Sequence, residues 1–124
     1  MGVELDPNAA ARATAAVEHA GLSHLVSVTV GNALDTPLAP ATVVFLYLLP
    51  KGNARLSAKL QRELAWPCTG GRARVVTSLF KMPSPWQPSA QGGVGSTRPG
   101  GVDTSAFTKV YLYTQPPAIS LPEA

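Results

Sequence analysis

The sequence predicts an α/β domain in which helices pack on a mostly parallel β-sheet. Patterns typical of strand, helix, strand, strand, helix and strand follow one another through the first 80 residues. The segment TVVFLYLL (residues 42–49) is apolar on both faces of its pleat, as in a parallel strand that helices cover on each side. A chain of 124 residues has room for one such domain.

The amino-terminal part is predicted to form a strand, a helix and a second strand. The segment GVEL (residues 2–5) is short and extended, and Asp6 and Pro7 are typical of a helix N-cap and a first helical position. Apolar residues recur on one face of the Ala-rich segment 8–20, and a glycine then follows to end the helix. The alternating, β-branched segment LVSVTV (residues 25–30) predicts the next strand.

The middle of the chain is predicted to hold a helix over residues 53–65 and a strand over residues 72–80. Leucines recur at every fourth position on one face of this helix, and basic residues occupy much of the remaining surface: Leu56, Leu60 and Leu64, against Lys51, Arg55, Lys59 and Arg62. The basic surface could meet an acidic partner or a membrane. Charge on the outer face of a helix usually serves solvation, which is the interpretation we favour.

The carboxyl-terminal third is predicted to be a long loop, one last strand and a tail. Residues 81–105 have no hydrophobic period and are rich in Pro, Gly and Ser. The segment AFTKVYLYT (residues 106–114) alternates and predicts a strand, and residues 115–124 form the tail. The predicted domain therefore spans residues 1–114 and includes the long loop.

Composition and charge exclude several classes of protein. Ten basic and seven acidic side chains give a net charge of +3, too mild a bias for a dense nucleic-acid-binding surface, so we expect no nucleic-acid partner. The single cysteine, Cys68, excludes an intramolecular disulfide framework. The longest apolar run ends at Pro50 after about half the length of a membrane helix, so we predict no transmembrane segment. Without a recognisable targeting segment, the compartment stays open between mitochondrion and cytoplasm.

Three residues are candidates for contact with a nucleotide-like ligand. Such ligands lie across the carboxyl ends of the strands in open α/β sheets. In these folds a carboxylate at the end of the fold's second strand accepts hydrogen bonds from ribose hydroxyls, and Glu4, at the end of the strand over residues 2–5, fits that role. In the turn GNALD, Asn32 and Ala33 would offer a small polar side chain and a backbone N–H to an adenine at the same edge. The alternatives are a surface acid beside a helix cap and an ordinary strand-to-loop turn.

Two further patterns carry little weight. Tyr47 and Lys51 have the Y-x-x-x-K spacing of short-chain dehydrogenases, but that pair must share one helical face and Pro50 lies between them. His19, His24 and Cys68 could suggest a metal site, yet a spacing of five places the two histidines on different faces even of a continuous helix. We therefore predict no metal.

Ordered segments of the chain resemble a known family. GVELDP, VTVGNALDTPL, TVVFLYLLP and GGRARVVTSLFKMPSPWQP together resemble class I S-adenosylmethionine-dependent methyltransferases from their second strand onward, over nearly the whole chain. More narrowly, FLYLLPKGNARLSAKLQREL, ARVVTSLFKMPSPWQP and a late VYLYT resemble the small protein-lysine N-methyltransferases. Those enzymes modify the mitochondrial adenine nucleotide translocase and the ATP synthase c subunit.

The resemblance implies S-adenosyl-L-methionine as the cofactor and the lysine side chain of a protein as the methyl acceptor. It implies that Glu4 holds the ribose, that Asn32 with Ala33 borders the adenine, and that Tyr47 with Leu48 lies where cofactor and acceptor meet. Asn32 stands where the family usually has Asp. An amide oxygen can also accept a hydrogen bond from an adenine amine.

The resemblance also implies an incomplete Rossmann-like fold, because the first strand and the Gly-rich turn of the family are missing from the sequence. That turn lets the backbone approach the cofactor closely. We therefore expect an N-terminally truncated methyltransferase that is inactive alone; the alternative is a non-catalytic remnant or binding module. The sheet should either divide into a two-strand and a three-strand piece, or close its second strand directly against its fourth.

Overall fold

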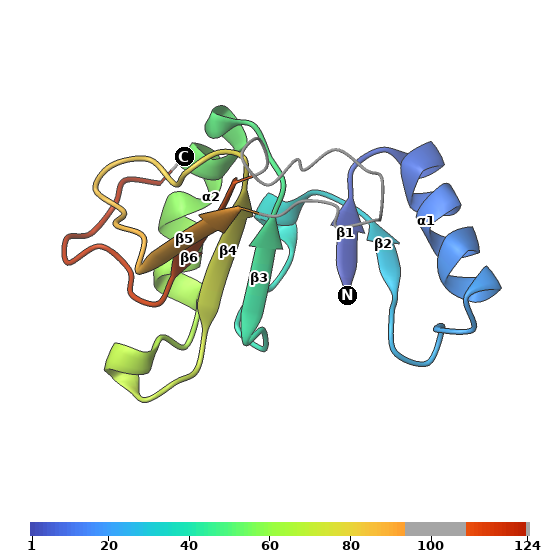
Figure 1. Cartoon of the computed structure of the whole chain (residues 1–124), viewed down its shortest axis with the longest axis horizontal. Helices are drawn as coiled ribbons and strands as arrows, with labels where there is room; N and C mark the ends of the chain where they lie inside the picture. The colour runs from blue at the N-terminus through green and yellow to red at the C-terminus, as the bar shows by residue number, and fades with distance from the viewer. Residues whose placement is uncertain (94–108, 124) are drawn as a thin grey trace. The chain divides into compact units, whose positions relative to one another are not determined.

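The structure, a computed structural model, describes residues 1–93 and 109–123, which belong to two compact units of residues 1–37 and 38–124 (Figure 1). The first unit holds a two-stranded sheet and the second a four-stranded sheet. Of the two arrangements expected from the sequence, the described residues therefore show the divided sheet, with one strand more than expected in the larger piece.

The first unit is a single β-α-β element. Strand β1 (Gly2–Glu4) pairs in parallel with β2 (Val28–Val30), and helix α1 (Pro7–His19) connects them. The predicted cap is confirmed, because the Asp6 carboxylate accepts a hydrogen bond from the N–H of Asn8 at 2.9 Å. Beyond the end of the helix, Gly21 adopts a φ of +71°, a left-handed conformation that favours glycine. A short 3-10 helix, η1 (Ala33–Asp35), follows β2.

The second unit contains four strands in the order β3 (Val43–Leu46), β4 (Arg74–Ser78), β6 (Lys109–Tyr113) and β5 (Ala90–Gly93). Strands β3 and β4 are the one parallel pair in the described part of this sheet, and β6 runs antiparallel to both of its neighbours. The prediction of a mostly parallel sheet is therefore wrong for this unit, since two of its three strand pairs are antiparallel.

Strand β5 corrects the prediction that residues 81–105 form one loop. The sequence AQGG has little intrinsic preference for a strand, and all four of its residues are exposed. It is extended because it lies in register with β6, from Ala90 opposite Leu112 to Gly93 opposite Lys109. Residues 94–105 of the predicted loop, and residues 106–108 of the predicted last strand, lie outside the described residues.

Helix α2 (Pro50–Glu63) covers one face of the larger sheet (Figure 1). It begins three residues earlier than predicted, because proline is well suited to a first helical position. The predicted apolar face is buried and includes Leu56 and Leu60. After the 3-10 helix η2 (Pro67–Thr69), the chain enters β4.

An aromatic cluster completes the core of the second unit. The ring centroids of Trp66 and Trp86 lie 5.7 Å apart, and those of Trp86 and Tyr113 lie 5.9 Å apart at right angles. All three side chains are buried. Such tilted and edge-to-face pairs stabilise a core beyond the area that they bury.

Strand β3 is an edge strand with one open face. Leu46 is buried, whereas Val43 and Phe45, whose side chains point to the opposite face, are 45% and 61% exposed. The sequence predicts that helices cover this strand on both faces. Among the described residues of this unit, a helix covers one face only, so that prediction is wrong. The sequence pattern indicated two apolar faces but could not show what packs on each.

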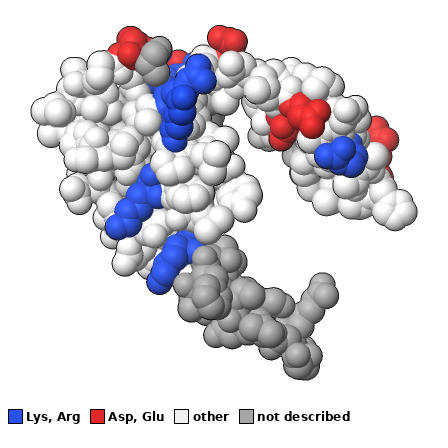
Figure 2. All heavy atoms as spheres, turned by 90° about the horizontal axis from the view of Figure 1, so that it is seen from above, with Lys and Arg blue, Asp and Glu red and all other residues white. Residues whose placement is uncertain are grey.

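Charge is divided unequally between the units. The first has one basic and four acidic side chains, a net charge of −3, and the described part of the second has eight basic and two acidic ones, a net charge of +6. On the face shown in Figure 2, Lys and Arg side chains lie in separate groups, some of them next to Asp and Glu side chains. Within the described part of the chain, no helix is both long and apolar enough to cross a membrane.

Candidate functional site

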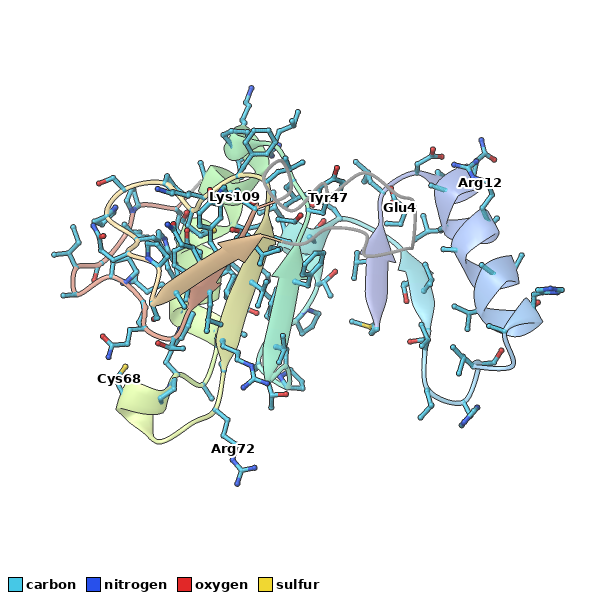
Figure 3. The ribbon with its side chains drawn as sticks, viewed as in Figure 1. Glu4, Arg12, Tyr47, Cys68, Arg72 and Lys109 are labelled. Atoms are coloured by element: carbon cyan, nitrogen blue, oxygen red, sulfur yellow. The ribbon has the colours of Figure 1, made fainter. Side chains whose placement is uncertain are left out.

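The first unit brings three of the predicted residues to one edge of its sheet. Glu4 lies opposite Val30 at the carboxyl ends of the two parallel strands, and its carbonyl accepts a hydrogen bond from the N–H of Gly31 at 2.9 Å. Asn32 and Ala33 follow directly. Figure 3 shows Glu4 at the end of β1. The backbone pairing therefore fixes Glu4 beside the turn that carries Asn32.

The Glu4 side chain retains capacity to bind a ligand. It is half-buried, and its Oε1 accepts a hydrogen bond from the N–H of Asp6 at 3.1 Å. A carboxylate has acceptor sites on two oxygens, and one local hydrogen bond leaves most of them available. These free acceptor sites fit a pair of ribose hydroxyls, which would donate to them.

The Asn32 side chain is more constrained than the sequence indicated. Its Oδ1 caps η1 by accepting a hydrogen bond from the N–H of Leu34 at 2.9 Å. The oxygen has a second lone pair, so a ligand amine would share it with this cap. By contrast, the N–H of Ala33 meets no acceptor among the described residues and is available as a hydrogen-bond donor.

The two remaining candidates belong to the second unit. Tyr47 and Leu48 follow the carboxyl end of β3 and are 66% and 38% exposed, and Figure 3 shows the position of Tyr47. They precede α2 rather than lying in it, whereas Lys51 lies in its first turn. Tyr47 and Lys51 therefore do not share a helical face, as the dehydrogenase motif would require.

The second unit also contains a feature that sequence reasoning missed. After β4, Leu79 adopts a φ of +69°, and the buried Asn53 donates hydrogen bonds from its side chain to the carbonyls of Phe80 and Lys81. Asn53 is the first residue of the predicted helix over residues 53–65, so from the sequence it resembles an ordinary cap residue. The local pattern around Leu79 gives no signal of a left-handed residue.

The histidines and the cysteine belong to different units. His19 ends α1, His24 lies in the loop before β2, and the exposed Cys68 lies in η2 of the other unit. Across residues 1–93 and 109–123, no three His, Cys, Asp or Glu side chains are grouped as a metal site requires.

Comparison with known families gives a match over most of the chain. Residues 1–90 match the family described as the ANTKMT methyltransferase domain. A protein-lysine N-methyltransferase of Saccharolobus islandicus (strain REY15A) is 34% identical over 88 residues, which are 71% of this chain and 51% of that protein. The chain thus spans about half the length of this curated relative.

A solved structure is similar over almost the entire chain. The RNA methyltransferase of Salinibacter ruber, crystallised in complex with S-adenosyl-L-homocysteine, gives a TM-score of 0.74 at 31% sequence identity. The match covers 99% of this chain and 68% of that one. It confirms the predicted Rossmann-like methyltransferase fold. The named relatives agree on methyl transfer and differ in the acceptor, a protein lysine in one and RNA in the other.

Proposed function

The chain belongs to the ANTKMT methyltransferase domain family, and on that premise we propose that it forms part of an S-adenosyl-L-methionine-dependent protein-lysine N-methyltransferase. The family implies S-adenosyl-L-methionine as cofactor. The lysine acceptor is supported by the S. islandicus relative, which is a protein-lysine N-methyltransferase.

The observation that carries this proposal is the hydrogen bond between the carbonyl of Glu4 and the N–H of Gly31. It places a carboxylate and the Asn32–Ala33 turn at one carboxyl edge, where an open α/β sheet binds a nucleotide. In the proposed site, Glu4 accepts hydrogen bonds from the ribose, and Asn32 and Ala33 border the adenine. On the second unit, Tyr47 and Leu48 would contact the acceptor.

The transfer itself requires little acid–base chemistry from the protein. When bound, the cofactor supplies a methyl group on a sulfonium sulfur. With an acceptor lysine bound, that methyl group would pass to the neutral ε-amine, the demethylated cofactor would leave as a thioether, and the methylated ammonium would release a proton to solvent. The protein contributes by aligning amine and methyl group, and the apolar parts of Tyr47 and Leu48 suit a channel that excludes water.

We further propose that the 124-residue chain is inactive by itself. The sequence has no D-x-G-x-G segment, the turn whose backbone approaches the cofactor in the resembled family. On this proposal the chain supplies the adenine and ribose half of a site. A non-catalytic binding module of the same fold is the alternative, and it predicts no transfer in any context.

A chimera tests the function directly. The chain would replace the matched residues of the S. islandicus enzyme, and the product would be incubated with methyl-labelled cofactor and protein extracts. We expect label on lysine side chains, identified by mass spectrometry, and none with the 124-residue chain alone. A chimera that binds cofactor but labels no lysine would contradict the lysine proposal.

RNA is the second candidate acceptor to be tested in the same experiment. The described part of the second unit has a net charge of +6, which favours polyanions, and the S. ruber relative is an RNA methyltransferase. Label on RNA and not on lysine would establish RNA as the acceptor. Transfer by the 124-residue chain itself would overturn the proposal that it is inactive alone.

A further inference from the structure

The segment after β4 contains a strained turn. Leu79 has a φ of +69°, and the N–H of Phe80 donates to the carbonyl of Ser78 at 2.8 Å. A positive central φ and a hydrogen bond across one residue are the marks of a γ-turn of the rare, strained kind. Such conformations persist only where surrounding contacts hold them, and they cluster at functional sites.

Two contacts hold this turn. The N–H of Leu79 donates to the carbonyl of Lys109, the first residue of β6, at 2.7 Å. The Nδ2 of Asn53 donates to the carbonyls of Phe80 and Lys81 at 3.2 and 3.3 Å. One side-chain amide of α2 therefore binds both residues that follow the turn.

The specific contribution of the Asn53 side chain comes from its N–H donors. It is 1% exposed, and among the described residues its Oδ1 has no hydrogen-bond partner. Burying an unpaired amide oxygen is costly. Rotating the amide would not relieve that cost, since it would turn the oxygen toward two carbonyl oxygens. An apolar side chain would fill the same space without an unpaired oxygen, so the two donated hydrogen bonds are the specific contribution of Asn53.

Asn53 links the carboxyl ends of two neighbouring strands. Strands β3 and β4 are parallel, so their carboxyl ends lie at one edge of the sheet. Tyr47 and Leu48 follow β3 and lead into the first turn of α2, where Asn53 lies. Phe80 and Lys81 follow β4. The amide thus holds the loop after β4 against the helix that begins after the candidate acceptor residues.

We propose that Asn53 is a positioning residue for methyl transfer, which acts by holding the Leu79 turn at the acceptor side of the site. This inference rests on the function proposed above. The held segment includes Lys81, whose Nζ lies 5.5 Å from the centre of the Tyr111 ring. Asn53 would therefore set the position of the backbone at residues 79–81 and, through it, that of the Lys81 ammonium.

Hydrogen exchange on the 124-residue chain tests the structural half of the proposal. In Asn53→Leu, the amides of Leu79, Phe80 and Met82 should exchange at least about tenfold faster, while amides of β4 change little. The matched control is Ser57→Ala, since Ser57 is also buried one turn later and, among the described residues, its hydroxyl donates to the carbonyl of Asn53 alone. Equal acceleration throughout the second unit would mean that Asn53 serves general stability, and would overturn the proposal.

A second variant acts on the same turn without touching α2. Leu79→Gly permits the positive φ without strain, so the chain should unfold at the same or a higher urea concentration, and the amides of residues 79–82 should exchange more slowly because the closed turn no longer stores strain. Leu79→Ala keeps the strain and serves as its control. Unchanged exchange in the glycine variant would show that the turn needs no holding, which contradicts a positioning role.

The chimera tests the functional half. Asn53→Leu should lower kcat at least about tenfold and leave cofactor affinity unchanged, because Asn53 lies on the acceptor side. An unchanged kcat, with exchange accelerated at the turn, would overturn the positioning role alone. An inactive parent chimera would count against the proposed function, while the exchange result would still decide whether Asn53 holds the turn.

Discussion

The carboxylate of Glu63 accepts a hydrogen bond from the backbone N–H of Leu38 at 3.1 Å, across 25 residues of sequence. The same carboxylate pairs with the Lys59 ammonium at 2.7 Å, one helical turn earlier. The end of α2 is thereby tied to the residue that begins the second unit. Lys59, and next the Leu38 N–H, lower the pKa of Glu63 below its ordinary value.

These contacts predict an acid-sensitive contribution to stability. A lowered pKa in the folded state stabilises the protein above the ordinary pKa of about 4.5, and this contribution is lost as the pH falls through the lowered value. Glu63→Gln should cost about 0.5–1 kcal/mol at pH 7. Urea unfolding of the wild type and the variant at pH 7 and at pH 2 measures this cost. An equal cost at pH 7 and pH 2 would show that the charge of Glu63 is not responsible.

Tyr113 should give the opposite dependence at alkaline pH. Burial raises the pKa of its hydroxyl above the ordinary value of 10.0. The contribution of this group to the free energy of unfolding is therefore fully present below pH 10.0 and is lost as the pH rises through the raised pKa. Tyr113→Phe should remove this alkaline loss. It should also cost about 1–3 kcal/mol at pH 7, because the N–H of Met82, which donates to the hydroxyl at 2.9 Å, loses its acceptor. Tyr111→Phe, in the same strand, is the control, and unfolding curves at pH 7 and pH 11 provide the measurement.

Glu4 should contribute directly to cofactor affinity in the chimera. Glu4→Ala should weaken binding of S-adenosyl-L-methionine by about 1–3 kcal/mol, the usual effect of leaving buried hydrogen-bonding groups unpaired. Isothermal titration calorimetry measures this change. Glu18→Ala removes an exposed carboxylate from α1 of the same unit and should leave affinity unchanged. If the two variants bind equally well, Glu4 does not contact the cofactor.

The open edge of β3 should make the 124-residue chain self-associate. Val43 and Phe45 are exposed on a strand that has one sheet neighbour among residues 1–93 and 109–123, and its sequence, VVFL, contains no charge or proline to discourage pairing with another chain. Phe45→Lys places a charge on this strand and should shift the sedimentation profile toward monomer. Val28→Lys, in the smaller sheet, is the comparison. A wild-type chain that stays monomeric at high concentration would contradict the expectation.

The sequence was most informative where local interactions decide the structure. Asp6 and Pro7 determine the start of α1 through a cap and a fixed φ, and both act within a few residues. The edge that carries Glu4 and Asn32 also followed from the sequence, because parallel strands place their carboxyl ends together. The cofactor-binding roles of these residues stay predictions.

The features that the sequence did not reveal depend on contacts between distant segments. Strand β5 exists because β6 offers it a partner, although AQGG alone favours a turn. The predicted strand 72–80 ends at Ser78, because the chain turns at Leu79. Hydrogen bonds to the Lys109 carbonyl and from the Asn53 side chain stabilise this turn. The side chain of Asn53 acts on residues that lie 27 and 28 positions away, a relationship that no local pattern encodes.

The position of Cys68 gives the chain a natural attachment point for a fluorescent dye. It is the one cysteine of the sequence, it is exposed, and it lies in η2 of the second unit. A maleimide dye would therefore label this unit alone, without removal of other thiols. A second thiol introduced at the exposed His24 of the first unit would complete a donor–acceptor pair, and energy transfer between the dyes would then measure the separation of the two units in solution.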